Sequence, residues 1–373
     1  MDRKELLGGV KRIVVKVGTS TLANADGSLN EDKIKQIVAN LSELNENAEV
    51  VFVTSGAVGA GMGQMKLAHK PKSIVEKQAL AAIGQVSLIH LYQILFWAHG
   101  KTIAQLLLTK DDFSDRRRYL NMRSVLRSLL AKKIIPVINE NDAVAVDEIK
   151  IGDNDNLSAV VAALVDADAL IILSDIDGVY TANPRTDASA RLIFEISEIT
   201  PEIERIAGGA GSAQGTGGMQ TKIEAAKIAQ NAGVTMVIAQ GNADGVIRGI
   251  LRGQEIGTLF PAREAHLKTR KSWLAFGKRL MGDLSVDDGC VAAMRHGASL
   301  LAVGVTGVYG DFAAGETVRI LGPTGQEIAR GIAAYNAADV ARLMGHQTTD
   351  FQELITDAAH EEIIHRDNLV LMT

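Results

Sequence analysis

Lys16 is the first residue in this sequence whose type and position suggest chemistry, because it interrupts an apolar run just before a small polar turn. The run is Ile13–Val17, and Gly18, Thr19 and Ser20 follow it. A buried ammonium group is costly unless an anion or a carboxylate lies nearby. A lysine on an edge strand, pointing to solvent, is the alternative. We favour a phosphate ligand, because the turn also offers backbone N–H groups and hydroxyls.

A second turn, Ser55–Gly61 (SGAVGAG), follows an apolar strand and leads towards a helical stretch. Glycines let backbone N–H groups approach an anion closely, and a helix N-terminus adds positive potential. Packing alone could also explain these glycines. The chain has no GxxxxGK[ST] motif and no GxGxxG motif, which argues against a P-loop kinase and against dinucleotide binding.

The segment Gly152–Ser158 (GDNDNLS) places two carboxylates and two amides in succession, ahead of an alanine-rich helix. Helix capping would explain one of them but not four. Such a cluster could bind a substrate ammonium group, orient lysines, or contact Mg²⁺ through water. It lacks the glutamate at the twelfth position of a calcium-binding loop.

Gly208–Lys222 (GGAGSAQGTGGMQTK) is rich in glycine and runs into a helix, which suits a flap over a nucleotide. A disordered surface loop is the alternative. The segment Ser174–Tyr180 follows a strand and could line an adenosine pocket. None of the eight histidines lies in these turns, so we do not expect a histidine base. A carboxylate acceptor needs none, because phosphoryl transfer to it requires positioning and charge neutralisation.

The elements that must position these turns alternate between short apolar strands and longer helical patterns. The predicted strands are Ile13–Val17, Val50–Val53, Ile134–Ile138, Leu170–Leu173 and Val234–Ala239. The predicted helices are Glu31–Leu44, Lys77–Trp97, Leu120–Ala131 and Thr221–Ala232. Continuous apolar strands are typical of a parallel sheet that is buried on both faces. The pattern predicts a doubly wound, mainly parallel α/β sandwich, in which ligands bind beyond the carboxyl ends of the strands.

The character of the sequence changes after about Phe260, where a polar linker leads to short strand-like pieces punctuated by glycine. These pieces are Gly282–Val286, Ser299–Val305, Gly307–Tyr309 and Glu316–Leu321. Frequent turns indicate a small β-barrel-like domain. We therefore divide the chain into an α/β domain (1–260), a linker (261–281), a β-rich domain (282–357) and a C-terminal extension (358–373).

Charge and composition limit the partners. The formal net charge is −5, and from Lys278 onward seven Lys and Arg face thirteen Asp and Glu, so we expect no nucleic-acid partner. A single cysteine, Cys290, excludes an intramolecular disulfide and a CxxC metal site. The N-terminus does not read as a secretory signal, and no apolar run approaches the ~20 residues that span a bilayer. We expect a cytoplasmic protein without a membrane segment.

The turns described above carry a resemblance to a known family. In order along the chain stand VVKVGTS, VTSGAVGAG, PVINENDAV, EIKIGDNDNLSA, SDIDGVYTANP and GTGGMQTKIEAA. They resemble the glutamate 5-kinase (γ-glutamyl kinase) family, which has the amino acid kinase fold. Gly331–His346 looks like part of its appended PUA domain, so the resemblance covers nearly the whole chain. It implies ATP- and Mg²⁺-dependent phosphorylation of the γ-carboxylate of L-glutamate, the first step of proline biosynthesis, by direct in-line transfer.

The resemblance also implies roles for single residues. It assigns Lys16 and Lys222 to the transferring phosphoryl group and gives Asp155 the task of holding both lysines. Glutamate would be bound by Ser55, Asp142 and Asn154, with the Gly56 amide near the reacting carboxylate. ATP would be bound by Lys16, Ser174, Asp175, Thr216, Gly217, Gly218, Met219, Gln220, Thr221 and Lys222. No residue is assigned as a direct metal ligand. Ser174 stands where the family often has threonine, and Asn183 where YTADP is usual, which bears on details of the nucleotide pocket.

The resemblance further implies feedback inhibition by proline, a homo-oligomer, and hand-over of the labile acyl phosphate to a glutamyl phosphate reductase. Arg116–Arg118 could be a solvated charged run or could serve an interface or regulation. Two other functions stay open at this point. One is a related kinase with a different acceptor. The other is an RNA-binding or RNA-modifying protein, because PUA domains often contact RNA, although the acidic C-terminal part argues against it.

Overall fold

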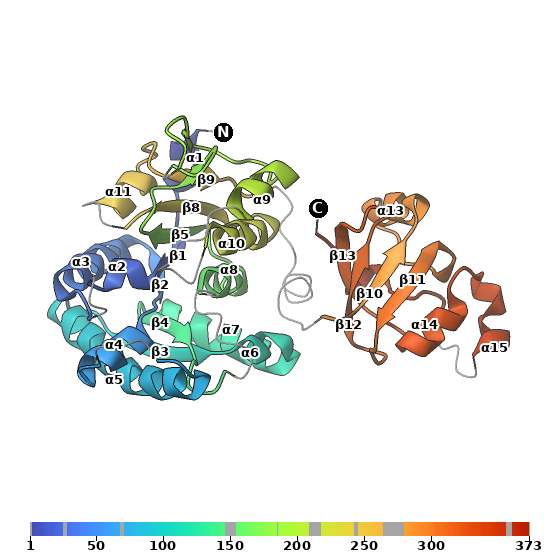
Figure 1. Cartoon of the computed structure of the whole chain (residues 1–373), viewed down its shortest axis with the longest axis horizontal. Coiled ribbons are helices and arrows are strands. Elements are labelled where there is room, and N and C mark those ends of the chain that lie inside the picture. Colours follow the sequence, from blue (N-terminus) through green and yellow to red (C-terminus); the bar gives the residue numbers. More distant parts are fainter. Residues whose placement is uncertain are drawn as a thin grey trace. The chain divides into compact units, whose positions relative to one another are not determined.

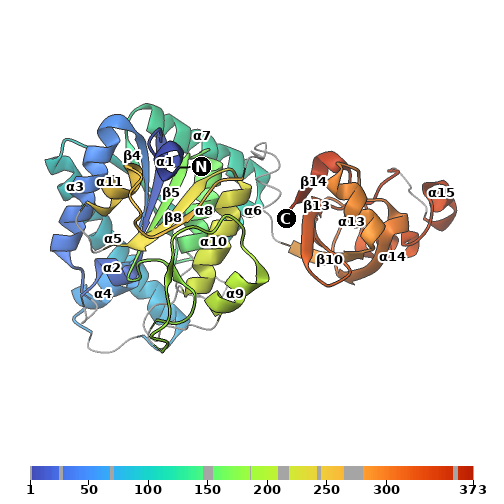
Figure 2. The ribbon, with the colours of Figure 1, turned by 90° about the horizontal axis from the view of Figure 1, so that it is seen from above.

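The computed structural model of the 373-residue chain describes residues 2–24, 28–67, 71–145, 154–184, 186–208, 218–241, 245–263, 280–355 and 360–372. The chain divides into two compact units (Figures 1 and 2). The first unit consists of Met1–Thr109 and Leu120–His266, and the second of Lys110–Tyr119 and Leu267–Thr373.

The first unit contains a seven-stranded sheet in the order β3-β4-β2-β1-β5-β8-β9. The strands are β1 (Arg12–Val17), β2 (Glu49–Val53), β3 (Ile103–Leu108), β4 (Ile135–Glu140), β5 (Ala169–Ser174), β8 (Thr235–Gln240) and β9 (Thr258–Phe260). All neighbours pair in parallel except β8 and β9. A separate pair is formed by β6 (Val179–Tyr180) and β7 (Leu192–Ile193). The predicted fold class, a mainly parallel α/β sheet, is confirmed.

Helices cover both faces of this sheet. The helices of this unit are α1 (Arg3–Leu7), α2 (Thr19–Leu22), α3 (Glu31–Asn47), α4 (Ala57–Gln64), α5 (Ile74–Ala98), most of α7 (Arg116–Ala131), α8 (Asn154–Leu164), α9 (Pro201–Gly208), α10 (Met219–Asn231) and α11 (Val246–Leu251), whereas α6 (Lys110–Ser114) belongs to the second unit. Figure 1 shows α3 and α11 on one side of the sheet and α8 and α10 on the other. The sheet is thus the middle layer of three, as a doubly wound fold requires.

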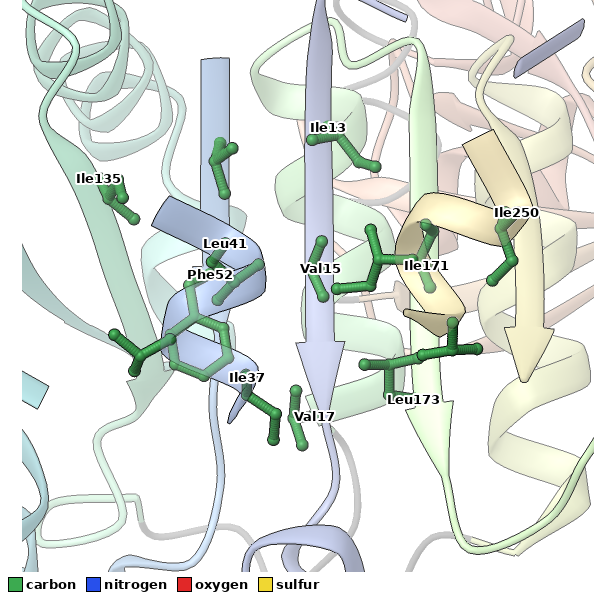
Figure 3. Close-up of a cluster of buried hydrophobic side chains, with 14 of the residues drawn as sticks. Ile13, Val15, Val17, Ile37, Leu41, Phe52, Ile135, Ile171, Leu173 and Ile250 are labelled. Atoms are coloured by element: carbon green, nitrogen blue, oxygen red, sulfur yellow. The ribbon is translucent and has the colours of Figure 1, made fainter. Parts of the chain in front are cut away.

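The alternation of side chains along β1 explains where Lys16 points. Ile13, Val15 and Val17 belong to one fully buried cluster that also contains Ile37 and Leu41 of α3 (Figure 3). Successive side chains of a strand point to opposite faces. Lys16 therefore points to the other face, where α8 packs against β1.

The strand order also explains why the polar turns meet. From β1 the chain first adds β2, β3 and β4 on one side, and later β5, β8 and β9 on the other. Because the strands from β3 to β8 are parallel, their carboxyl ends share one edge of the sheet. Ligands of such sheets bind at that edge, near the strand where the order reverses.

The second unit contains a five-stranded sheet in the order β11-β10-β12-β13-β14. Its elements are β10 (Leu280–Val286), α13 (Asp288–Arg295), β11 (Val305–Gly310), β12 (Thr317–Leu321), β13 (Glu327–Ile332), α14 (Ala337–Leu343), α15 (Phe351–Leu354) and β14 (Leu369–Leu371). Pairs are antiparallel except β10 with β12. The strand β14 lies in the segment that we assigned to a C-terminal extension.

One strand-like piece predicted for this unit differs in the structure. Within Ser299–Val305, Leu300 forms only an isolated bridge with Ile364, and Ala302–Gly304 form a 3₁₀ turn. Gly304 ends this turn in close contact with α13, because a Cβ there would lie 2.7 Å from the Cβ of Cys290. This part of the predicted strand is therefore a turn and not a strand.

Helix α5 is the only helix among the described residues that is long and apolar enough to cross a membrane. The residues on its inner side pack against the core of the unit. Leu88, Tyr92 and Phe96 are fully buried in the cluster that α5 shares with the sheet. Its outer residues Val75, Val86 and Trp97 are exposed.

Candidate active site

Three charged side chains meet beyond the carboxyl end of β1. Lys16 Nζ lies 2.5 Å from Oδ1 of Asp155, and Lys222 Nζ lies 3.1 Å from Oδ2 of the same carboxylate. Thr221 Oγ1 also donates to Oδ2, at 2.9 Å. Asp155 is fully buried, and both lysines are buried. The structure thus brings together the three residues that the resemblance assigns to the transferring phosphoryl group and to holding the two lysines.

Separate elements deliver these side chains. Lys16 comes from β1, Asp155 from the first turn of α8, and Lys222 from the first turn of α10. The two helices pack against each other on the same face of the sheet. Gly18 is the first residue after β1, and a Cβ at this position would lie 3.5 Å from Lys16 Nζ. The turn after β1 therefore borders the lysine directly.

Burial and neighbouring charges shift the pKa values of this cluster in opposing ways. Burial, the largest influence, lowers the pKa of Lys16 and outweighs the attraction of Asp155; the charge of Lys222 adds to the lowering. Burial alone would raise the pKa of Asp155, but the two lysines and the hydrogen bonds it accepts lower it. Two ammonium groups therefore share the carboxylate of Asp155 in a site withdrawn from water, and Asp175 also attracts Lys16. This arrangement of cationic donors suits a phosphoryl group.

A second cluster lies on the β2 and β4 side of Lys16. The two hydrogens of Asn154 Nδ2 face three acceptors: the carbonyl oxygen of Thr54 at 2.8 Å, Ser55 Oγ at 2.7 Å and Asn139 Oδ1 at 3.0 Å. Asn154 Oδ1 is buried and has no hydrogen-bond partner in the described part of the chain. A buried acceptor left unpaired is costly, so this oxygen points to a ligand that donates a hydrogen bond.

Gly56 begins α4 and has a left-handed backbone (φ 98°), which favours glycine. A Cβ on Gly56 would lie 4.0 Å from Cγ2 of Thr19, so the turns after β1 and β2 adjoin. The N-terminus of α4 is held by close contact with α5. A Cβ on Gly84 of α5 would come within 1.9 Å of the carbonyl oxygen of Ala57.

Asp142 lies in the turn after β4, two residues beyond its last residue. Burial raises the pKa of its carboxyl group to about 6. The structure pairs Ser55 with Asn154, but in the described part of the chain neither is hydrogen-bonded to Asp142. A half-buried carboxylate with a raised pKa gains from a cationic partner, such as a substrate ammonium group.

On the other side of Lys16, the residues predicted to bind ATP follow β5 and begin α10. Ser174 Oγ donates to Asp175 Oδ1 at 3.1 Å, and the charge of Asp175 attracts Lys16. Gly218 is the N-cap of α10 and offers no side chain to the free N–H groups of its first turn. Met219 and Gln220 follow in that turn. Thr216 and Gly217, like Gly152 and Asp153 of the acidic segment, lie outside the described residues.

Two residues of the site were not predicted from sequence. Asn139 stands within the INENDAV motif, but we gave it no role there. Gln85 belongs to none of the motifs. The only sign of it in the sequence is an amide side chain on the apolar inner face of a long helix. Asn139 Nδ2 donates to Gln85 Oε1 at 2.8 Å, which connects α5 to the second cluster.

The described ranges contain no group of three or more His, Cys, Asp or Glu side chains that could hold a metal ion. A magnesium ion in phosphoryl transfer is commonly bound through phosphate oxygens and water with few protein ligands. The described residues fit an ion that arrives with its nucleotide.

Comparison with known proteins follows the same division of the chain. Residues 11–240 match the amino acid kinase family, and residues 282–355 match the PUA domain. The chain is 49% identical to the glutamate 5-kinase of Moorella thermoacetica over 98% of its length and 97% of that protein. It is 50% identical to the glutamate 5-kinase of Caldanaerobacter subterraneus over 97% of its length and 98% of that protein. Among solved structures, a UMP kinase from Bacillus anthracis aligns with a TM-score of 0.47 and 17% identity, over 69% of this chain and 98% of that one.

Proposed function

On the premise that this chain belongs to the amino acid kinase family, with glutamate 5-kinases as full-length relatives, we propose that it phosphorylates the γ-carboxylate of L-glutamate with ATP. The product is L-glutamyl 5-phosphate, the acyl phosphate that starts proline biosynthesis. The observation that carries the proposal is the buried Lys16–Asp155–Lys222 cluster, with the unpaired acceptor Asn154 Oδ1 on one side and the N-terminus of α10 on the other, in the part of the chain that the structure describes.

We propose a direct in-line transfer. A γ-carboxylate oxygen of glutamate attacks the γ-phosphorus and forms the new O–P bond. The bond from that phosphorus to the bridging oxygen of ADP breaks, and its electron pair leaves with ADP. No base is needed, because the acceptor is already ionised. Lys16 and Lys222 offset the charge on the transferring oxygens, and Asp155 holds the two ammonium groups at the required separation.

The residues on the acceptor side, Asn154, Asp142 and Ser55, bind the α-ammonium and α-carboxylate groups of glutamate. Asn154 Oδ1 accepts a hydrogen bond from the substrate ammonium group, and the carboxylate of Asp142 supplies the opposing charge. Ser55 Oγ accepts from Asn154, which leaves its own hydrogen for the α-carboxylate. The amide region of Gly56 lies near the reacting γ-carboxylate. These groups position the acceptor so that binding energy is spent on orientation.

ATP would be held by Lys16, by Ser174 and Asp175 after β5, and by the segment from Thr216 to Lys222 that leads into α10. The N-terminal turn of α10 suits a phosphate, because its free N–H groups point along the helix axis. Mg²⁺ would enter with ATP and neutralise charge on the phosphate oxygens. No direct protein ligand to the ion is assigned.

Three further relations belong to the proposal. Proline inhibits, since it presents an ammonium group and an α-carboxylate to the same acceptor side. A glutamyl phosphate reductase consumes the product, because an acyl phosphate hydrolyses in water. The chain forms a homo-oligomer, and the exposed Val75, Val86 and Trp97 on one side of α5 favour that helix as the contact. A Trp97→Glu variant that sediments as a smaller species would support this contact.

The test is a trapping assay with purified protein, Mg-ATP and hydroxylamine. Glutamate, aspartate and N-acetylglutamate are offered separately, and hydroxamate is measured. We expect hydroxamate from glutamate alone. Hydroxamate mainly from aspartate or N-acetylglutamate would move the enzyme to another acceptor. No hydroxamate from any of the three, in folded protein, would refute the kinase assignment.

A further inference from the structure

We infer that Gln85 of α5 is a positioning residue for the acceptor: it sets the orientation of the Asn139 carboxamide, which in turn supports that of Asn154. The inference rests on the proposed function only in naming glutamate as the acceptor. Gln85 does not reach the reacting atoms, so it acts through two other side chains.

The orientation of Asn154 follows from a backbone group. The carbonyl oxygen of Thr54, 2.8 Å from the Asn154 carboxamide, can only accept a hydrogen bond. The atom facing it must be the nitrogen, Nδ2. Oδ1 then lies on the opposite side of the group, where it is buried and lacks a partner among the described residues.

The orientation of Asn139 follows from a second backbone group. The N–H of Glu140 donates to the Asn139 carboxamide at 2.9 Å, and an N–H can only donate. The atom facing it must be Oδ1, which also accepts from Asn154 Nδ2. Asn139 Nδ2 therefore points away from Asn154 and needs an acceptor of its own.

Gln85 supplies this acceptor. Its Oε1 accepts from Asn139 Nδ2 at 2.8 Å, and its side chain is 9% exposed. Its neighbours on the inner face of α5, Leu80, Ala81 and Leu88, are apolar and buried. A buried amide on such a face is costly unless it is hydrogen-bonded, so its bond to Asn139 gives the reason for its presence.

The three carboxamides form one directed chain through the layers of the unit. Gln85 belongs to α5, Asn139 to β4 and Asn154 to the start of α8. Reversing Asn139 would set its NH₂ group against the Glu140 N–H and remove an acceptor from Asn154. Removing the oxygen of Gln85 takes away the bond that opposes this reversal. The acceptor site would then hold the ammonium group of glutamate less well.

The experiment compares Gln85→Leu, which has no acceptor, with Gln85→Glu, which keeps an oxygen in reach of Asn139. For Gln85→Leu we expect the KM for glutamate to rise roughly tenfold, which is about 1.4 kcal/mol. The KM for ATP and kcat should stay within about threefold, because the lysine cluster is untouched. Gln85→Glu should recover most of the affinity for glutamate.

Gln230→Met is the matched control for a loss of stability alone. Gln230 is another buried glutamine, on α10, whose Nε2 donates only to the backbone carbonyls of Ile196, Ser197 and Pro261 in the described structure. We expect it to lower the melting temperature and leave the KM for glutamate unchanged. A control that raises this KM as much as Gln85→Leu does would overturn the inference.

Two other results would overturn it: an equal rise in both KM values for Gln85→Leu, or a Gln85→Glu variant as impaired as Gln85→Leu. A crystal structure of Gln85→Leu gives a readout that needs no substrate. Turned or disordered carboxamides at Asn139 and Asn154 would support the inference, and unchanged ones would refute it, whatever acceptor the enzyme uses. Failure of the proposed function would show separately, as a wild-type enzyme that does not turn over glutamate.

Discussion

The carboxyl group of Asp142 makes glutamate binding depend on pH in a way that can be calculated. Burial raises its pKa to about 6, and only the ionised form attracts the substrate ammonium group. At pH 7 roughly 90% of Asp142 is ionised, and at pH 5 roughly 10%. The value of kcat/KM for glutamate should therefore fall about tenfold between pH 7 and pH 5. An aspartate with the ordinary pKa would change by less than about 1.1-fold over this range.

The assay must separate Asp142 from the other groups that titrate, such as the phosphates of ATP. We propose to measure kcat/KM for glutamate at saturating Mg-ATP from pH 5 to pH 8, in the wild-type enzyme and in Asp142→Asn. At saturating Mg-ATP the enzyme–ATP complex governs this parameter, so its pH dependence reports the pKa before glutamate binds. Dividing the two values at each pH removes every titration that both proteins share.

The expected ratio of wild type to Asp142→Asn is roughly 10–160 at pH 7, because a hydrogen bond to a charged group is worth about 1.5–3 kcal/mol. The ratio should decrease towards pH 5 with an inflection near pH 6. A ratio that stays level over the whole range, or one with its inflection near pH 4, would refute the reasoning about Asp142.

Three further predictions concern other parts of the first unit. Lys222→Ala should fold normally and lose about 10²–10³ in kcat, since it removes a preorganised charge; unchanged turnover would exclude the role. Gly84→Ala should cost about 1–3 kcal/mol of stability and raise the KM for glutamate, because the new Cβ would meet the carbonyl of Ala57. Gly63→Ala in α4, where a Cβ finds ordinary contacts at 3.8 Å or more, is its control and should be stable and active. Arg3→Met should cost about 3 kcal/mol in chemical denaturation without changing kcat, since the buried Arg3 guanidinium donates to four backbone carbonyls. Denaturation midpoints equal to wild type would contradict that prediction.

The sequence predicted the central strands well, because each of them is a continuous apolar run. Such a run is typical of a strand in a sheet that is buried on both faces. It did not predict β3 or β9. β3 (IAQLLL) lies at one edge of the sheet with a polar Gln105 in its middle, and β9 has only three residues. Short or edge strands carry a weak apolar pattern, so their pairing is decided by the neighbouring strand.

The site was partly predictable for a different reason. Lys16 could be singled out because a charged group within an apolar run needs a partner. Asp155 was singled out by the resemblance, in a segment whose composition also suited the orientation of lysines, and the structure pairs the two residues. The contact of Thr221 with Asp155 and the amide chain through Asn139 to Gln85 could not be predicted. They depend on which helix faces which strand, and spacing along the chain does not contain that information.

The most direct measurement of the central claim uses glutamate labelled with ¹⁸O in both oxygens of the γ-carboxylate. The enzyme, Mg-ATP and hydroxylamine are added, and the released phosphate is analysed by ³¹P NMR. Hydroxylamine attacks the acyl carbon, so the phosphate leaves with the bridging oxygen. If the γ-carboxylate attacks the γ-phosphorus, phosphate should carry one ¹⁸O for each hydroxamate formed. Phosphate without ¹⁸O would mean that water accepts the phosphoryl group, and it would contradict the account.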